Sequence, residues 1–289
     1  MMRICVCVKQ TPDSASVYVD PISGQIDMER FVHVLNPADA CAVEAAVRLK
    51  EQFGGEVIAL TLGPQDAEAA LRVALANGAD KALRLWQAGA DTWDALMVAA
   101  ALSTGIQQTV GRTDLIMCGN VSSDWGSGIV GPAMAELLDL PQVTGVTKLQ
   151  AALEDKALKL RLTRRLERGY RELLEAEPPL LITTSVDLNE PRYPSLPAHM
   201  AALQATIPVI EPTLDSDWHE TATTTLLEIH TPRPLPRRIA APNSKHNAFQ
   251  RIGEIISSGA TGRQTHLVEG SPEELAGTLV AFLKEREFI

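Results

Sequence analysis

Aromatic residues are scarce in this chain of 289 residues, at 4% of the total. Proteins that bind single-stranded nucleic acid without sequence preference stack the bases on aromatic side chains. Acidic residues also outnumber basic ones, and the formal net charge is −10. Because an acidic chain repels the phosphate backbone, the composition argues against a nucleic-acid partner. The hydrophobic content of 45% is that of an ordinary globular protein.

Long apolar runs and paired cysteines are missing as well. No run reaches the roughly 18–20 residues that span a bilayer. We expect the chain to enter a strand directly after Met1, with no secretory signal. The cysteines have neither zinc nor iron–sulfur spacing, and they are Cys5, Cys7, Cys41 and Cys118. We predict a cytoplasmic protein without a metal site, in which these thiols are small buried hydrophobes.

The first half of the chain alternates between apolar strands and helical segments. Strands are predicted at 3–9, 56–62, 81–86 and 114–118, and helices at 36–50, 66–77, 93–109 and 132–140. Residues 10–14 are expected to form a loop, and a hairpin is expected around Ser23–Gly24. Apolar strands that alternate with helices indicate an α/β fold, doubly wound and Rossmann-like, with a mostly parallel sheet.

The stretch from Gly119 to Pro132 is the strongest candidate for a ligand site. It reads Gly-Asn-Val-Ser-Ser-Asp-Trp-Gly-Ser-Gly-Ile-Val-Gly-Pro and joins a predicted strand to a predicted helix. Glycines let a ligand approach the backbone, and serines, backbone N–H groups and a helix N-terminus favour phosphate. The alternative is a tight connection with ordinary caps. The spacing is not that of a P-loop, and Gly126–Gly131 matches GxGxxG in form only, because no acidic residue follows at the expected position.

Four segments converge on the same edge of the predicted sheet. Ligands on parallel sheets bind beyond the carboxyl ends of the strands, at a switch point. Residues 7–9, 36–39, 62–63 and 119–132 lie at or near such ends. We therefore predict an adenine-nucleotide site formed by Cys7, Val8, Asn36, Pro37, Ala38, Asp39, Leu62, Gly63, Gly119, Val121, Ser122, Ser123, Asp124, Gly126, Ser127, Gly128, Ile129, Val130 and Gly131.

The pattern changes after Pro141. Antiparallel strands are predicted at 143–150, 158–166 and 170–174, and a buried strand at 179–185. Prolines in 189–197 exclude a helix interior or a central strand. This segment is either a rigid protrusion that docks a partner through Tyr193 and Leu196, or a stiff loop packed on the body.

Residues 206–271 are polar and weakly periodic, and a final helix is expected to begin after an N-cap at Ser271. We place a nucleotide-binding domain at 1–205, including a recognition loop at 189–200. The remaining residues, 206–289, are expected to form an extended C-terminal arm and helix.

Several of these segments together resemble the beta subunit of electron transfer flavoprotein. The resemblance extends over essentially the whole chain, and the stretches that carry it are 6–13, 35–39, 42–50, 76–82, 188–197 and 270–285. The most specific of them is Leu188-Asn-Glu-Pro-Arg-Tyr-Pro-Ser-Leu-Pro197, which is similar to the recognition loop of that family.

The resemblance implies that this chain forms a heterodimer with an alpha subunit. The heterodimer would be an electron carrier, and this chain would not be a catalyst on its own. It would relay electrons from a flavin dehydrogenase, such as acyl-CoA dehydrogenase, to a membrane quinone reductase or a ferredoxin- or flavodoxin-type acceptor. It implies a redox FAD mostly on the alpha subunit, and AMP or, in electron-bifurcating members, a second FAD in this subunit. Its contacts would fall on the strand-end residues named above. A dehydrogenase would dock on Arg192, Tyr193, Leu196, Pro197 and Met200, with Leu196 as the anchor, and the arm would wrap the alpha subunit.

The sequence departs from the family pattern at informative positions. Where the family has Asp-Gly-Asp-Thr-(Gly/Ala)-Gln-Val-Gly-Pro, this chain has Asp124-Trp-Gly-Ser-Gly-Ile-Val-Gly-Pro. Ser127 can still donate to phosphate, but Ile129 cannot replace an amide. Arg165 stands where the family has a glutamate that helps to hold the flavin domain.

The stretch Ser122–Asp124 is closer to the branch associated with nitrogen fixation and carnitine metabolism, some of whose members bifurcate. We therefore favour a second FAD, with AMP as the alternative. A different class, a stand-alone adenine-nucleotide-binding protein of the universal-stress type, would leave the recognition loop and the arm unexplained. An NAD-dependent dehydrogenase is disfavoured by the missing acidic residue.

Overall fold

The computed structural model describes residues 2–18, 26, 32–154, 157–214, 247–249, 251–252 and 270–285. The chain divides into two compact units, residues 1–232 and 233–289. The hairpin predicted around Ser23–Gly24 lies outside the described residues. The predicted domain boundary at 205/206 stays a prediction.

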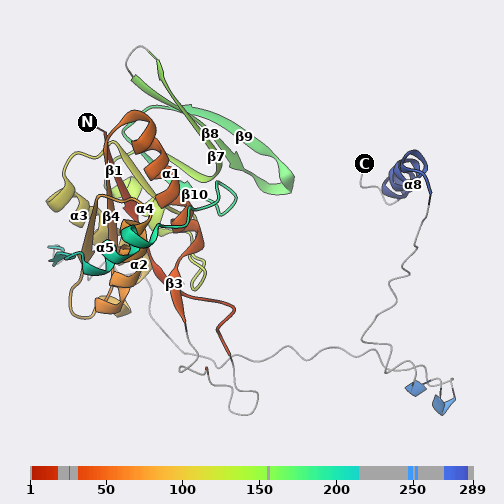
Figure 1. Cartoon of the computed structure of the whole chain (residues 1–289), viewed down its shortest axis with the longest axis horizontal. Coiled ribbons are helices and arrows are strands. Elements are labelled where there is room, and N and C mark those ends of the chain that lie inside the picture. The colour runs from red at the N-terminus through yellow and green to blue at the C-terminus, as the bar shows by residue number, and fades with distance from the viewer. Residues whose placement is uncertain are drawn as a thin grey trace. The chain divides into compact units, whose positions relative to one another are not determined.

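A nine-stranded sheet, counted over the described residues, forms the centre of the first unit in the order β11-β5-β4-β1-β6-β10-β7-β8-β9 (Figure 1). The strands are β1 (Arg3–Cys7), β4 (Glu56–Leu62), β5 (Lys81–Leu85), β6 (Leu115–Gly119), β7 (Gln142–Glu154), β8 (Ala157–Arg165), β9 (Arg171–Ala176), β10 (Leu180–Thr184) and β11 (Val209–Ile210). Neighbouring strands from β11 to β7 run parallel. Strand β8 is antiparallel to β7, and β9 is antiparallel to β8. The predicted α/β fold, with a mostly parallel sheet and an antiparallel addition, is confirmed.

Helices cover both faces of the sheet. The described helices are α1 (Pro37–Phe53), α2 (Glu68–Ala76), α3 (Ala95–Gly105), α4 (Val130–Leu137), α5 (Leu196–Gln204) and α8 (Pro272–Glu285), with single turns η2 (Gln65–Ala67), η3 (Ala90–Thr92), η4 (Ile106–Val110) and η5 (Glu167–Gly169). None of them, within the described parts of the chain, is long and apolar enough to cross a membrane.

Two hydrophobic cores lie on opposite faces of the sheet. Ile4 and Val6 of β1 pack with α1 and α2, while Cys5 and Cys7 pack with α3 and α4. Successive side chains of a strand point to opposite faces, so a strand that is apolar throughout serves both cores. The cysteines are buried free thiols, as expected for small buried hydrophobes.

The β7–β8–β9 meander extends the sheet as a twisted ribbon (Figure 1). Leu160 and Leu162 of β8 are fully buried against the first core, whereas Leu173 of β9 points away from it and is exposed. Residues 143–150 were predicted as an antiparallel strand, but β7 is antiparallel only to β8 and runs parallel to β10. The prediction missed this because a sequence pattern does not show which two neighbours a strand has.

Two local predictions were wrong. Residues 10–14 were expected to be a loop, yet β2 (Gln10–Pro12) pairs antiparallel with β3 (His33–Leu35). The recognition loop was expected to extend to residue 200, yet α5 begins at Leu196. The hydroxyl of Ser195 accepts a hydrogen bond from the N–H of Ala198 at 3.3 Å, and Pro197 lies in the first turn. Proline is tolerated there because that N–H has no helical partner.

Hydrogen bonds place β11 and begin α8, which are the last described strand and helix of the chain. At the sheet edge, the N–H groups of Arg84 and Trp86 donate to the carbonyls of Pro208 and Ile210, which brings β11 beside β5. In the second unit, α8 starts as predicted after Ser271. The N–H of Ser271 donates to the Glu274 carboxylate at 2.9 Å, and the N–H of Glu274 donates back to the Ser271 hydroxyl at 3.4 Å. This reciprocal pair is a capping box.

Candidate nucleotide site at the carboxyl ends of the strands

The strand order places a switch point between β1 and β6. From β1 the sheet continues through β4 and β5 on one side and through β6 and β10 on the other. Ligands of open α/β sheets bind beyond the carboxyl ends of the strands at such a point. The segments that follow β1 and β6 and the start of α1 meet there, through contacts of Asp39 and Asn36.

Asp39 joins the ends of the two central strands. Its side chain lies in the first turn of α1 and is buried. The carboxylate accepts hydrogen bonds from the N–H of Lys9, at 2.8 Å, and from the N–H of Gly119, at 2.6 Å. A Cβ at position 119 would lie 2.4 Å from Asp39 Oδ1 and 2.8 Å from the Ala38 Cβ. Only glycine allows β6 to end this close to α1.

Burying the charged Asp39 carboxylate costs free energy, because the charge is removed from water. Removal from water raises the pKa of Asp39 to about 6, although the hydrogen bonds from Lys9 and Gly119 lower it. The carboxylate is therefore ionised at neutral pH, and its charge is held by backbone donors that would otherwise end their strands without partners.

Asn36 fixes the glycine-rich stretch that follows β6. Its side-chain amide donates to the carbonyl of Val121 at 3.0 Å and accepts from the N–H of Ser123 at 3.2 Å. Asn36 is the N-cap residue of α1, but its side chain makes no capping hydrogen bond to that helix. The amide is instead used over long range, to hold a segment more than eighty residues away.

Lys9 and Asp124 form a third link between β1 and the glycine-rich stretch. The Lys9 ammonium lies 2.5 Å from the Asp124 carboxylate, which also accepts from the N–H of Trp125 at 2.8 Å. Partial burial would raise the pKa of Asp124, but the hydrogen bonds from Lys9, Ser122 and Trp125 outweigh it and hold that pKa below its ordinary value. The structure thus brings Asn36, Asp39 and Asp124 together at this edge, with their polar atoms bonded within the protein.

The donors left over are backbone N–H groups. Those of Ser127, Gly128, Ile129, Val130 and Gly131 have no hydrogen-bond acceptor among the described residues. They precede and open α4, where the helix itself supplies no acceptors. Consecutive free N–H groups at the start of a helix form a site suited to an anion such as phosphate.

The other predicted site residues fall into three groups. Cys7, Val8, Ala38 and Gly131 are buried and pack inward. Leu62 and Gly63 end β4 and hydrogen-bond toward β5, and nothing described joins them to the glycine-rich stretch. The exposed or half-exposed members are Pro37, Val121, Ser122, Ser123, Gly126, Ser127, Gly128, Ile129 and Val130.

Sequence reasoning missed three contributors at this edge. They are the Lys9 side chain and two buried threonines. The hydroxyl of Thr61 donates to the Val8 carbonyl at 2.7 Å, and that of Thr184 donates to the Ala38 carbonyl at 2.8 Å. A threonine near the end of a fully apolar strand is the signal that could have found them, because a buried hydroxyl needs a partner.

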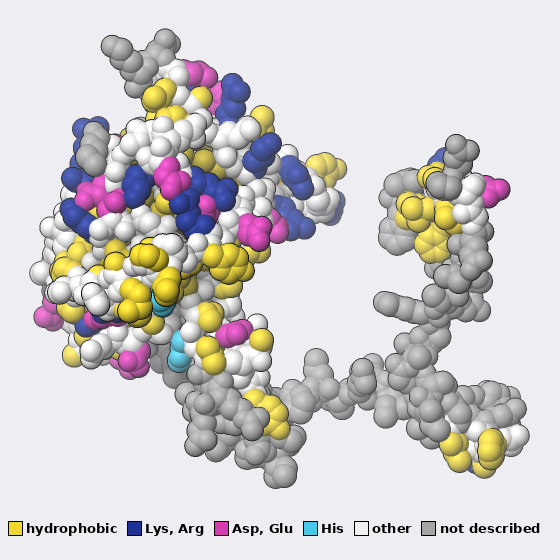
Figure 2. All heavy atoms as spheres, viewed as in Figure 1, with side chains coloured by type: hydrophobic (Ala, Val, Ile, Leu, Met, Phe, Trp, Pro, Cys, Tyr) yellow, Lys and Arg dark blue, Asp and Glu magenta, His cyan; other side chains and the backbone are white. Residues whose placement is uncertain are grey.

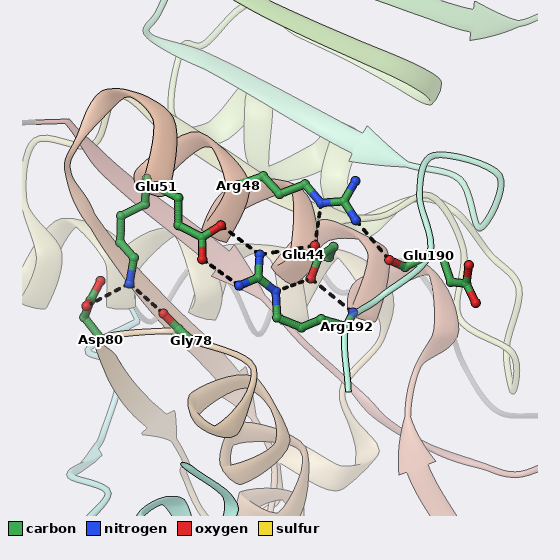
Figure 3. Close-up of polar contacts among 8 residues, drawn as sticks. Glu44, Arg48, Glu51, Gly78, Asp80, Glu190 and Arg192 are labelled. Carbon is green, nitrogen blue, oxygen red and sulfur yellow. Dashed lines mark hydrogen bonds and ion pairs between the residues drawn. The ribbon is translucent and has the colours of Figure 1, made fainter. Parts of the chain in front are cut away.

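The segment before α5 is fastened to α1 by a cluster of ion pairs (Figure 3). The Arg192 guanidinium donates to the buried Glu44 at 2.8 Å and to both carboxylate oxygens of Glu51 at 2.6 and 2.9 Å. Arg48 completes the cluster by donating to Glu44 at 2.5 Å and to the Glu190 carbonyl at 3.2 Å. We call Arg192, Glu44, Glu51 and Arg48 the arginine clamp.

The arginine clamp lowers the pKa values of its two glutamates. Burial would raise the pKa of Glu44, but hydrogen bonds from Arg192 and Arg48 outweigh it and lower that pKa. The hydrogen bond from Arg192 also lowers the pKa of Glu51. Arg192, predicted among the docking residues, is therefore held within the protein.

The clamp leaves an apolar surface uncovered. Tyr193, Leu196 and Met200 are 94%, 73% and 48% exposed. Leu196 and Met200 are four residues apart on α5, so they share one face of the helix. Pro197 lies beside them in the first turn.

Fold and site together define a doubly wound α/β protein with a candidate anion site at its switch point. A family model described as the electron transfer flavoprotein domain matches residues 24–215. The chain is 35% identical over 292 residues to the caffeyl-CoA reductase-Etf complex subunit CarD of Acetobacterium woodii, with 100% of both chains covered. It is 42% identical over 198 residues to the electron transfer flavoprotein subunit beta of Thermoanaerobacterium thermosaccharolyticum, which covers 68% of this chain and 72% of the relative. It is also 37% identical over 209 residues to FixA of Azorhizobium caulinodans, which covers 71% and 74%.

The chain belongs to the electron transfer flavoprotein family, as a member of the beta-subunit and FixA group. The predicted resemblance is confirmed. Membership carries a role in electron transfer, association with flavin at the level of the complex, and pairing with an alpha subunit.

Asp39 gives a prediction about pH. Its raised pKa means that the folded state holds the proton more tightly than the unfolded state, so its contribution to stability is complete below about pH 4 and is lost as pH rises through about 6. In Asp39→Asn this loss disappears. Urea unfolding at pH 4 to 7 should show the wild type losing about 3 kcal/mol relative to the variant across that range. Parallel stability curves would mean that Asp39 does not titrate in this window.

The arginine clamp gives a second prediction. Arg192→Gln leaves Glu44 buried with only Arg48 as a partner, and we expect a loss of about 3 kcal/mol in the free energy of unfolding. Arg161→Gln is the matched control, because Arg161 pairs with Glu175 on the surface and should cost no more than about 1 kcal/mol. Equal losses in the two variants, measured by urea unfolding at pH 7, would show the clamp to be an ordinary surface pair.

Proposed function

We propose that this chain is the beta subunit of an electron-transferring heterodimer and that it holds a nucleotide at the carboxyl ends of β1 and β6. The observation that carries the proposal is the run of free N–H groups from Ser127 to Gly131, held in place by Asn36 and Asp39. A flavin, when bound in the complex, supplies the redox chemistry.

Each part of the site has a role toward a phosphate-bearing ligand. The N–H groups before α4 and the Ser127 hydroxyl donate to phosphate oxygens, and the helix dipole favours the negative charge. Asn36 and Asp39 position these donors without touching the ligand themselves, because their polar atoms are already used. The residues present therefore fit a nucleotide phosphate.

The identity of the nucleotide is the finer part of the proposal. We favour a second FAD over AMP. The match to a subunit of a caffeyl-CoA reductase-Etf complex spans both whole chains, and FixA proteins are among the relatives. Both support the branch that the Ser122–Asp124 stretch suggested. Ile129, in place of a family amide, removes one side-chain donor and leaves polar recognition to the backbone N–H groups and the Ser127 hydroxyl.

The partners follow from the exposed surface and the relatives. A flavin dehydrogenase is proposed to dock on Tyr193, Leu196 and Met200, with Arg192 and Pro197 shaping the segment. The name of the Acetobacterium relative joins it to a caffeyl-CoA reductase, which supports a dehydrogenase acting on a CoA thioester, such as acyl-CoA dehydrogenase. Electrons would leave through the alpha subunit's FAD to a quinone reductase or a ferredoxin- or flavodoxin-type acceptor, in the cytoplasm.

The C-terminal residues complete the proposed heterodimer. The arm and helix at 206–289 are proposed to contact the alpha subunit. In α8, Leu279, Val280 and Phe282 are apolar and exposed within their unit. Family membership removes the stand-alone universal-stress-type alternative, since that reading rested on the glycine-rich stretch alone.

The nucleotide site is tested by its two polar side chains. Asp124→Ala with Ser127→Ala should weaken retention of the nucleotide in this subunit at least about tenfold, because a phosphate donor and the Lys9 link are lost together. Nucleotide released from the purified complex is measured by chromatography after dialysis. Asp91→Ala, an exposed carboxylate on η3, is the control. Full retention in the double variant would make the stretch structural only.

The docking surface is tested by one leucine. Leu196→Ala should slow electron transfer from the partner dehydrogenase about tenfold or more, as expected for an apolar anchor. Bound nucleotide should stay unchanged, because α5 packs on α2 and none of the described hydrogen bonds joins it to the glycine-rich stretch. Leu153→Ala, on the exposed end of β7, is the matched control. Transfer rates that stay at the wild-type value would remove the docking role of Leu196.

A further inference from the structure

The glycine-rich stretch exposes three apolar side chains beside its free N–H groups. Val121, Trp125 and Ile129 are 44%, 81% and 46% exposed. They lie in the same short segment as the donors from Ser127 to Gly131. Large apolar side chains that a fold leaves exposed together mark a place where something binds. The candidate anion site is therefore accompanied by apolar surface.

Trp125 contributes most of this surface. The chain has four tryptophans, and of the others that the structure describes, Trp86 and Trp93 are half-buried. Trp125 stands where the family pattern given above has a glycine, and Ile129 stands where it has a glutamine. Both departures put an apolar side chain in place of a small or polar residue. They therefore change the stretch in the same direction.

The backbone of Trp125 is held by the same network as the rest of the site. Its N–H donates to the Asp124 carboxylate at 2.8 Å, and that carboxylate pairs with Lys9 at 2.5 Å. The N–H of Gly126 donates to the Ser122 carbonyl at 3.0 Å, which closes a turn around Trp125. Gly126 has a φ of 62°, which glycine adopts without strain. Trp125 is thus fixed two residues before the first free N–H group.

The neighbouring donors indicate what covers these apolar side chains. Another group of exposed apolar side chains gathers over α5 (Figure 2) and belongs to the docking surface described above. The group at 121–129 differs because free N–H groups lie in the same segment. A nucleotide joins a phosphate to an aromatic ring, so a single ligand can meet both. A protein surface would account for the apolar side chains alone.

We propose that Trp125 stacks on an aromatic ring of the nucleotide whose phosphate binds at Ser127–Gly131, with Val121 and Ile129 beside it. This inference rests on the proposed function and names the side chain that recognises the ring. Stacking is tolerant of the ring's identity, because each such ring has a π-face. Trp125 therefore gives the site a preference for phosphates that carry an aromatic ring, and it serves FAD and AMP alike.

The test compares Trp125→Leu with Trp125→Phe in the full chain co-purified with its alpha subunit. The FAD and AMP that remain after dialysis are quantified by chromatography. Trp125→Leu should weaken retention of the second nucleotide about tenfold or more, whereas Trp125→Phe keeps a ring and should weaken it less. Trp93→Phe is the matched control, at a half-buried position before α3, and should retain the wild-type amount.

Tryptophan fluorescence gives a readout that a merely structural role of Trp125 would not move. A ring stacked on Trp125 quenches its emission. The wild type and Trp93→Phe should therefore become brighter when the second nucleotide is released. Trp125→Phe should show no such increase, because the quenched tryptophan is absent.

Each outcome decides between the alternatives. Weak retention in Trp125→Leu, better retention in Trp125→Phe and loss of the fluorescence increase support the proposal. Wild-type retention in Trp125→Leu, equal weakening in both variants, or an increase that persists in Trp125→Phe overturns it and leaves the strand-end site standing. Release of the alpha subunit from Trp125→Leu overturns it in favour of a subunit contact. A wild-type complex without a second nucleotide overturns the proposed function as well.

Discussion

A buried carboxylate at the start of α1 holds the two central strands of the sheet together at their carboxyl ends. Asp39 accepts from the backbone beyond β1 and from the last residue of β6, and Gly119 lets α1 come close enough for this. Asn36, three residues earlier, holds the glycine-rich stretch in the same way. Asn36 and Asp39 therefore hold the fold of this edge, and the polar groups left to meet a ligand are the backbone N–H groups and the Ser127 hydroxyl.

Helix α1 also positions the residues that precede α5. Glu44 and Glu51 follow Asp39 along α1, and through Arg192 they fix the residues before α5. One helix of 17 residues thus positions both the strand-end site and the exposed Tyr193, Leu196 and Met200. Because breaking a buried ion pair is costly, this arrangement keeps the apolar surface rigid before any partner arrives.

Much of the fold could be predicted because its strands are apolar throughout and its helices have clear starts and stops. Strand β4 and helix α1 are examples, with Gly54-Gly55 ending the helix. Strand β2 was missed because three residues with a proline read as a loop, and the start of α5 was missed because proline was taken to exclude a helix. Both are cases in which the position of a proline matters more than its presence.

The position of the candidate site could be predicted from the sequence, but the hydrogen-bond partners of its residues could not. The glycine-rich stretch and Asn36-Pro37 were visible as patterns, whereas the partners of Asn36, Asp39 and Glu44 lie 80 to 148 residues away along the chain in most of their contacts. Long-range pairing of this kind leaves no periodic signal. For the same reason the sequence placed Arg192 among the residues that meet a partner, whereas the structure pairs it with Glu44 and Glu51.

We propose above that this subunit holds a nucleotide of its own. It is tested most directly by co-expressing the chain with its alpha subunit, denaturing the purified complex, and quantifying released FAD and AMP by chromatography. We expect two nucleotides per heterodimer, with two FAD as the favoured result and one FAD with one AMP as the alternative. A single FAD with no second nucleotide would contradict it.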